Sequence, residues 1–305
     1  MSAGDFLLDL GHFPWLVLFG LVIGVIGGFF GVGGGFLMVP MLNVVFGIPY
    51  NICVGSDLGQ MCGMSTAATV RHARFGNIDF KLGFLMILGT ATGVELGAVL
   101  LEFLKHAGEA TMTVVMSLVY AALLLFLGQA IVRESLRTMK AGGGEADGSA
   151  GGPPATGVVL RLRTLKIWPM VSLPKSGIQS ISLWVILGIG FATGLLSGML
   201  GVGGGFIRMP ALVYIMGCPT VVAVGTDLFE IMFSAGYGVF THSMKGNVHL
   251  VLVLALLIGT TIGAQVGATY TRKAGGPHVR FGFGCLAFIG VVMVGIKLCI
   301  KFMGH

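Results

Sequence analysis

One glycine-rich hexapeptide, GVGGGF, occurs twice in this chain, at residues 31–36 and again at residues 201–206. Glycine lacks a Cβ, so a run this dense lets the backbone leave helical geometry. N–H groups freed at the start of a following helix form a nest for an anion, because the helix dipole favours negative charge there. Close helix packing through small residues is the alternative explanation. We predict that the anion nests are formed by Gly33, Gly34, Gly35, Gly203, Gly204 and Gly205.

A nucleotide-binding loop does not explain the hexapeptide. Position 36 is phenylalanine where a GxGxxG pattern needs glycine, and no Gly-Lys-Ser/Thr follows either copy. Both copies lie in apolar stretches, whereas a nucleotide loop joins a strand to a helix in a βαβ unit.

Arg208 is a charged residue in an otherwise apolar stretch just after the second hexapeptide, where the first copy has Met38. Ionisable side chains inside a membrane are costly, so they are functional candidates. A guanidinium beside the nest would hold an oxyanion with two hydrogen bonds. An ion pair with Asp57, Asp227 or Glu230 is an equally good explanation.

A hydroxyl-bearing residue followed by aspartate comes directly after a glycine in each half, as Ser56-Asp57 and as Thr226-Asp227. This pattern is typical of a helix N-cap, which is the role we favour for both aspartates. Capping a broken helix in mid-membrane would place both hydroxyls beside the bound anion.

Three more polar side chains are candidates for capping or coupling. Glu95 lies within an apolar run, where a carboxyl either couples to protons or, as we favour, makes a hydrogen-bonded contact between helices. Gln60 offers a further hydrogen-bond donor, and Glu230 belongs to the same group. No nucleophile–base pair or metal-ligand spacing is visible, so we expect no enzyme, no metal and no cofactor.

The composition indicates an integral membrane protein, whose helices are surrounded by lipid. Of its 305 residues, 55% are hydrophobic and 10% are charged, against about 25% charged in soluble domains. Basic residues gather at the ends of apolar runs, which is an orientation signal and gives no reason to expect nucleic acid as a partner. Runs long enough for a helical crossing are Phe13–Phe30, Phe80–Leu104, Met112–Val132, Leu183–Leu200, Val248–Tyr270 and Phe281–Ile300.

The chain is internally duplicated. At an offset of 170 positions, GVGGGF falls on GVGGGF, Val-Gly-Ser-Asp-Leu falls on Val-Gly-Thr-Asp-Leu, and Gly76-Asn77 falls on Gly246-Asn247. We predict a first membrane repeat over residues 1–132, a glycine-rich linker over 133–180 and a second membrane repeat over 181–305.

Loop charges predict that the two repeats have opposite orientations. Basic residues favour the cytoplasmic side, and the loops that carry them alternate between the halves so that only an inverted arrangement satisfies all of them. The amino terminus is then outside and the linker inside the cell. The predicted fold class is an all-α integral membrane protein, an inverted repeat of helical bundles with glycine-broken or re-entrant helices. Hydropathy leaves open whether the short segments Phe36–Phe46, Cys53–Val70, Phe206–Met216 and Ala223–Phe240 are re-entrant or cross fully.

The stretches GVGGGFLMVPML with GSDL, and GVGGGFIRMPAL with GTDL, closely resemble the sulfite exporter TauE/SafE family of permeases. The resemblance covers both halves and nearly all of the chain outside the linker. It implies a carrier in the bacterial inner membrane for sulfite, sulfonates or related anions, with export in many members.

From residues and resemblance together we predict a secondary transporter that exports a small sulfur-containing anion by alternating access. An anion-selective channel with a glycine-loop filter is the alternative. Its expected partners are the anion and membrane lipid. A proton or sodium as coupling ion and a homodimer stay open.

Overall fold

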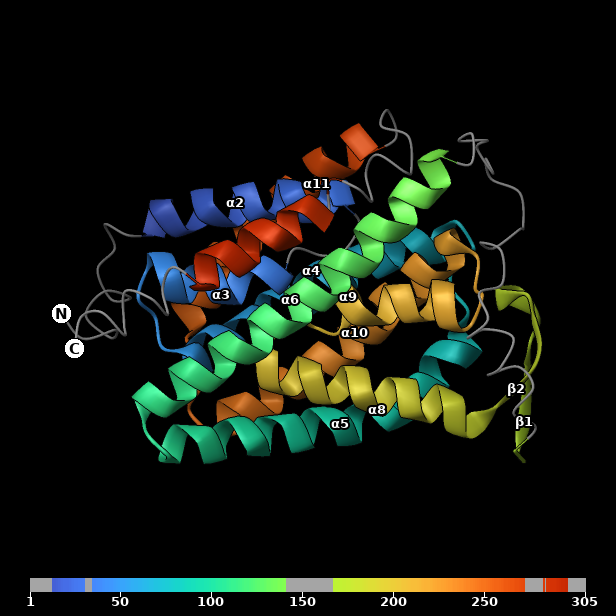
Figure 1. Ribbon diagram of the computed structural model, residues 1–305, viewed down its shortest axis with the longest axis horizontal. Helices are drawn as coiled ribbons and strands as arrows, with labels where there is room; N and C mark the ends of the chain where they lie inside the picture. Colours follow the sequence, from blue (N-terminus) through green and yellow to red (C-terminus); the bar gives the residue numbers. More distant parts are fainter. Residues whose placement is uncertain (1–12, 31–34, 141–166, 272–281, 283, 296–305) are drawn as a thin grey trace. The chain divides into compact units, whose positions relative to one another are not determined.

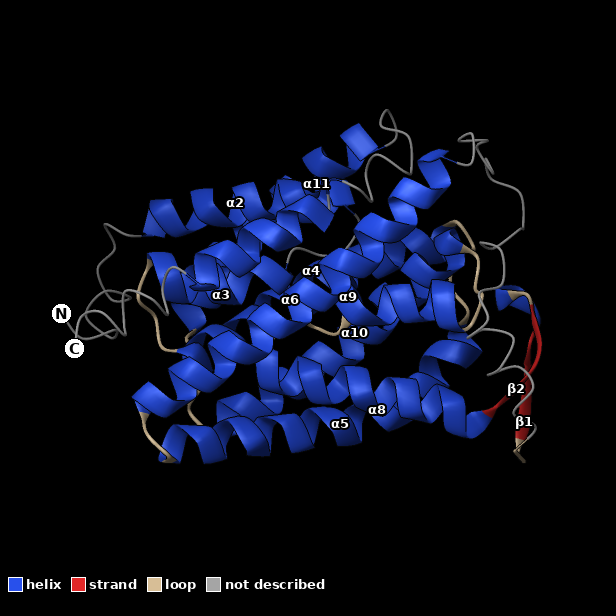
Figure 2. Ribbon diagram, viewed as in Figure 1, coloured by secondary structure: helices blue, strands red, loops and turns tan. Residues whose placement is uncertain are grey.

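The protein is described by a computed structural model, which covers residues 13–30, 35–140, 167–271, 282 and 284–295. These residues are almost entirely helical, apart from one short β-hairpin (Figure 2). The helices are α2 (Phe13–Phe30), α3 (Gly35–Val45), α4 (Tyr50–Arg74), α5 (Phe80–His106), α6 (Glu109–Lys140), α8 (Leu183–Leu200), α9 (Gly205–Pro210), α10 (Thr220–Met244) and α11 (Leu250–Thr271), with a π-helical segment η3 (Ala211–Ile215) after α9.

Length and apolar composition make four of the described helices candidates for a membrane crossing. A crossing needs about 20 apolar residues. The candidates are Phe80–His106, Glu109–Arg133, Leu183–Leu200 and Leu250–Gly267. Shorter apolar helices cover Phe13–Ile26 and Gly284–Gly295.

The chain folds as two compact units, and each unit contains segments of both sequence copies. One unit comprises residues 1–57, 101–145 and 247–305, and the other comprises 58–100 and 146–246. In the first unit α2 packs against α11, and in the second α5 lies beside α8 (Figure 1). A helix from one copy therefore pairs with a helix from the other in both units.

These two helix pairs are held close by glycines spaced four apart. Helices whose small residues recur at this spacing bring their backbones into contact, as in membrane helix dimers. In the second unit a Cβ on Gly194 of α8 would meet the backbone of Thr90. In the first unit a Cβ on Gly24 of α2 would lie 2.7 Å from the Cα of Thr260. Both residues of the second pair stand 170 positions from those of the first, so the copies make equivalent contacts.

The predicted short segments in the middle of each half are longer than hydropathy indicated. Cys53–Val70 and Ala223–Phe240 lie within α4 and α10, which are unbroken helices of 25 residues each. Their glycines do not interrupt them, because a glycine inside a helix also serves close packing. A Cβ on Gly225, for example, would meet the carbonyl oxygen of Asn77 within the second unit.

The predicted linker, 133–180, is partly folded. Its first residues extend α6 to Lys140, and its last ones form strand β1 (Met170–Leu173), the 3₁₀ turn η2 (Pro174–Ser176) and strand β2 (Ile178–Ser182). The strands pair antiparallel and bury Leu173 and Ile178 against α5, α8 and η3. The glycine-rich middle of the linker lies outside the described residues.

Candidate functional site

The second glycine cluster forms a bend between two helices. Helix α8 ends at Leu200, and Gly201, Gly203 and Gly204 follow in left-handed geometry, with φ of 75°, 65° and 77°. Residues other than glycine rarely adopt these angles, so the sequence fixes the bend here. Helix α9 then begins at Gly205.

The first glycine cluster is described only at its end. Gly33 and Gly34 lie outside the described residues, and Gly35 is the first residue of α3. Their role in an anion nest stays a prediction.

The side chains of Met61, Arg208, Asp227 and Ile231 fill the space around the second bend. A Cβ on Gly203 would meet the Met61 side chain, and one on Gly204 would meet Nη2 of Arg208. A Cβ on Gly205 would lie 2.8 Å from Oδ2 of Asp227. The glycines thus allow a charged cluster to press directly against the backbone.

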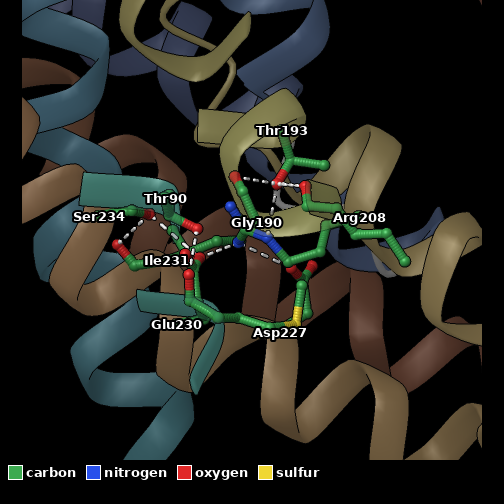
Figure 3. Close-up of polar contacts among 10 residues, drawn as sticks. Thr90, Gly190, Thr193, Arg208, Asp227, Glu230, Ile231 and Ser234 are labelled. Carbon is green, nitrogen blue, oxygen red and sulfur yellow. Dashed lines mark hydrogen bonds and ion pairs between the residues drawn. The ribbon is translucent and has the colours of Figure 1, made fainter. Parts of the chain in front are cut away.

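Arg208, on α9, is the centre of this cluster and is fully buried. Its Nη1 is 3.1 Å from Oδ1 of Asp227 and forms a second ion pair with Oε2 of Glu230. Its Nε donates a hydrogen bond of 3.3 Å to the hydroxyl of Thr193 on α8. Figure 3 shows the guanidinium reaching from α9 toward Thr193 on one side and the two α10 carboxylates on the other.

Helix α10 presents its polar residues on one face. Asp227, Glu230 and Ser234 are spaced by three and four residues, which places them on the same side of a helix. The Ser234 hydroxyl donates a 3.2 Å hydrogen bond to Oε2 of Glu230. All three residues are buried, so this polar face points into the protein.

The cluster contains more negative than positive charge. One guanidinium faces two carboxylates, and all three side chains are at most 8% exposed. Nη2 of Arg208 has no hydrogen-bond acceptor among the described residues. Buried charges are stabilised only when they are paired and hydrogen-bonded, and this cluster has one carboxyl group more than it has cations and one donor without an acceptor among the described residues.

The N-cap role predicted for the two aspartates is wrong. Asp57 lies in the interior of α4 and Asp227 in the interior of α10, so neither is at a helix start. The Gly-Ser/Thr-Asp pattern resembles a cap locally, but the tertiary packing carries the helix through it. For Asp227 the alternative partner, Arg208, is the one that the structure contains.

The two predicted hydroxyl ligands make matched structural contacts. The Ser56 oxygen accepts a 3.0 Å hydrogen bond from the backbone N–H of His249, within the first unit. The Thr226 oxygen accepts one of 2.9 Å from the N–H of Asp79, within the second. Each hydroxyl thus accepts a hydrogen bond from the backbone N–H of the residue just before α11 or α5. A direct role for either hydroxyl in binding the substrate stays a prediction.

Glu95 makes the helix contact that we favoured for it. Its carboxylate accepts hydrogen bonds from Tyr237 at 3.1 Å and Thr241 at 3.0 Å, and Lys245 lies 3.5 Å away. This side chain is 45% exposed and joins α5 to α10. Gln60 is buried in α4, at the position that matches Glu230.

Thr193 and Ser234 are site residues that the sequence reasoning missed. Both lie in apolar helices, and both contact a residue that had been singled out. Helical spacing was the available signal for Ser234, since it stands four residues after Glu230. Among the described residues no group of three or more His, Cys, Asp or Glu side chains is placed to hold a metal ion.

Comparison with known proteins places the chain among membrane transporters. It is 25% identical over 273 residues to "Probable membrane transporter protein YunE" of Bacillus subtilis, covering 86% of this chain and 89% of that one. It is 28% identical to YdhB of the same organism, over 84% of this chain and 89% of that protein. With MJ0441 of Methanocaldococcus jannaschii it shares 23% identity over 90% and 91% of the two chains.

The family follows from a match that covers most of the chain. Residues 16–294 match the sequence profile described as "Sulfite exporter TauE/SafE", so the chain belongs to the sulfite exporter TauE/SafE family. It is a multi-pass membrane protein of a transporter family, as the apolar helices indicated. No solved structure matches the chain.

Proposed function

We propose that this protein is a secondary transporter that exports a small sulfur-containing anion, such as sulfite or an organosulfonate, across the bacterial inner membrane. The family description names sulfite export, and the relatives are named as membrane transporters. The anion is proposed to bind beside the second glycine bend and to cross by alternating access between inverted repeats.

The observation that carries this proposal is the burial of Arg208. Among the lysine and arginine side chains that the structure describes, it alone is buried. A guanidinium binds a sulfur oxyanion with two parallel hydrogen bonds, and Nη2 of Arg208 has no acceptor among the described residues. Ionisable side chains inside a membrane are candidates for a functional site, and Arg208 keeps one N–H donor group beyond its two ion pairs.

The surrounding glycines support the same conclusion. Gly204 lies against Nη2, so an anion there would contact the backbone of the bend as well as the guanidinium. Gly203 and Gly205 complete this wall of the proposed site, which is built without side chains on the bend itself. The matching glycines of the first copy, Gly33, Gly34 and Gly35, stay a prediction from the sequence.

Sulfite efflux from proteoliposomes tests the proposal. We expect the wild-type protein to release loaded sulfite at a rate that saturates with concentration, and Arg208→Ala to abolish this release. Arg208→Lys retains the charge without the planar fork, so we expect weaker sulfite binding and a higher KM. Met38→Ala, at the matched position of the first copy, serves as the control and should retain efflux.

Wild-type efflux by Arg208→Ala would overturn the proposed site. Efflux that rises linearly without saturation would instead favour the anion channel over the carrier.

A further inference from the structure

We propose that the cluster of Arg208, Asp227 and Glu230 takes up a proton when it binds the transported anion, so that anion and proton are coupled at one site. This inference rests on the proposed function, because it assumes that Arg208 is the anion-binding residue. It adds the identity of the coupling ion and of the groups that carry it.

A bound anion would compete with Asp227 and Glu230 for the guanidinium of Arg208. Both carboxylates contact the same guanidinium nitrogen, Nη1, while Nε is bound to Thr193 and Nη2 is open. A bidentate oxyanion needs two neighbouring N–H donors of the fork. An anion that uses Nη2 together with Nη1 must therefore displace at least one carboxylate from Nη1.

An anion bound at the cluster would add to its negative charge. With all three groups ionised, the cluster carries a net charge of −1, and a bound monoanion would make it −2 inside an apolar helix bundle. Two carboxylates at one site oppose each other's ionisation, and a carboxylate that loses its cation is costly when buried. The displaced carboxylate therefore takes a proton from water, and the carboxyl O–H replaces the ion pair that was broken.

Within the described part of the chain, no charged side chain other than these three acts on the two carboxyl groups. The charged side chains that act on Asp227 are Arg208 and Glu230, and the polar neighbours of Glu230 are Thr90 of α5 and Ser234 of α10. On α8 the facing group is the neutral hydroxyl of Thr193. The proton is best assigned to the two carboxyls as a pair, because strongly interacting groups titrate together.

A second ionic contact of the same unit joins Glu95 and Lys245. Glu95 is 3.5 Å from Lys245 and accepts two hydrogen bonds, so it has its own cation and lies partly in solvent. It offers a matched control, a carboxylate between α5 and α10 that is outside the cluster.

Coupling of this kind makes anion affinity depend on pH. One proton taken up per anion strengthens the apparent affinity about tenfold for each pH unit of acidification within the linked range. A monoanion that crosses with its proton moves no net charge, so its accumulation inside the cell drives export.

Isothermal titration of the purified full-length protein with sulfite tests the coupling. Titrations in buffers of different ionisation enthalpy give the number of protons taken up per sulfite. The protons of sulfite itself cancel between variants that bind the same ionic form, so the difference between these proteins reports the cluster. We expect the wild type and Glu95→Gln to take up about one proton more than Glu230→Gln or Asp227→Asn.

Equal proton counts in the wild type and in both cluster variants would overturn the coupling and leave the proposed function standing. Failure of the wild type to bind sulfite at every pH titrated would overturn the proposed function and the coupling with it. The two variants guard against one of them failing to fold.

Discussion

The two copies of the duplicated segment keep the same scaffold contacts but differ in their chemistry. Where the second copy has Arg208 and Glu230, the first has Met38 and Gln60 at the matched positions. Both copies keep the aspartate, as Asp57 and Asp227. All of these residues are buried. An apolar side chain and a neutral amide thus occupy the places of the buried ion pair.

The contacts that hold the helices together show the opposite pattern. Gly24 and Gly194 meet Thr260 and Thr90 in the same way, and Ser56 and Thr226 each accept a backbone N–H. Duplication has preserved what positions the helices, while the ionic cluster is present in one copy. The two copies thus share the scaffold and differ in their buried ionic groups.

The largest expected effect comes from removing the cation alone. Arg208→Met reproduces the first copy at one position and leaves Asp227 and Glu230 buried without a counter-charge. Breaking a buried pair in this way costs about 3–5 kcal/mol. We expect unfolding in detergent to show this loss, and the double change Arg208→Met with Glu230→Gln to recover most of it.

A smaller loss is expected where α8 and α2 pack through glycine. Gly194→Ala and Gly24→Ala place a methyl against the backbone of Thr90 and Thr260. Overpacking of this kind costs about 1–3 kcal/mol, and equal losses in both variants would extend the equivalence of the two units. Gly188→Ala is the control, because nothing lies within 4 Å of its Cβ. Its thermal stability should stay the same or rise.

Two glycine variants distinguish the effect of backbone strain from an effect on the proposed site. Gly204→Ala and Gly246→Ala both place a side chain at positive φ, which costs about 1–2 kcal/mol each. Only the first pushes against Nη2 of Arg208, since nothing lies near Gly246. We expect similar losses of thermal stability but loss of sulfite efflux in Gly204→Ala alone. Equal efflux in the two variants would remove the bend from the site.

The smallest effect is expected for the matched hydroxyls. Thr226→Val and Ser56→Ala each remove the acceptor of one buried backbone N–H, from Asp79 and His249. A lost hydrogen bond of this kind costs about 1 kcal/mol. Thermal unfolding should show nearly equal losses, whereas a much larger effect of one variant on efflux would give that hydroxyl a direct role in transport.

Hydropathy and length were sufficient to predict most of the long helices. The predicted runs Phe13–Phe30 and Leu183–Leu200 coincide with α2 and α8, because a lipid-soluble helix needs a long apolar run and little else. The break after α8 followed from glycine density. The unbroken length of α10 was not predicted, because its polar residues and glycines lower its hydropathy while tertiary packing keeps it helical.

The ionic cluster was predicted only as a set of alternatives. Arg208 was identified by its charge, and Asp227 and Glu230 were two of its three candidate partners. The choice among them depends on how α9 packs against α10, which no local pattern encodes. The hairpin of β1 and β2 was missed because its strands are only four and five residues long and follow a polar, glycine-rich stretch.

Sulfite efflux by the double variant Arg208→Met with Glu230→Gln tests the asymmetry between the copies most directly. At positions 208 and 230 this variant carries the side chains of the first copy, so it retains the scaffold without the ionic cluster. Our account predicts a folded protein, with a melting temperature close to that of the wild type, that releases no sulfite from proteoliposomes. Wild-type efflux by this variant would contradict the assignment of the binding chemistry to the second copy.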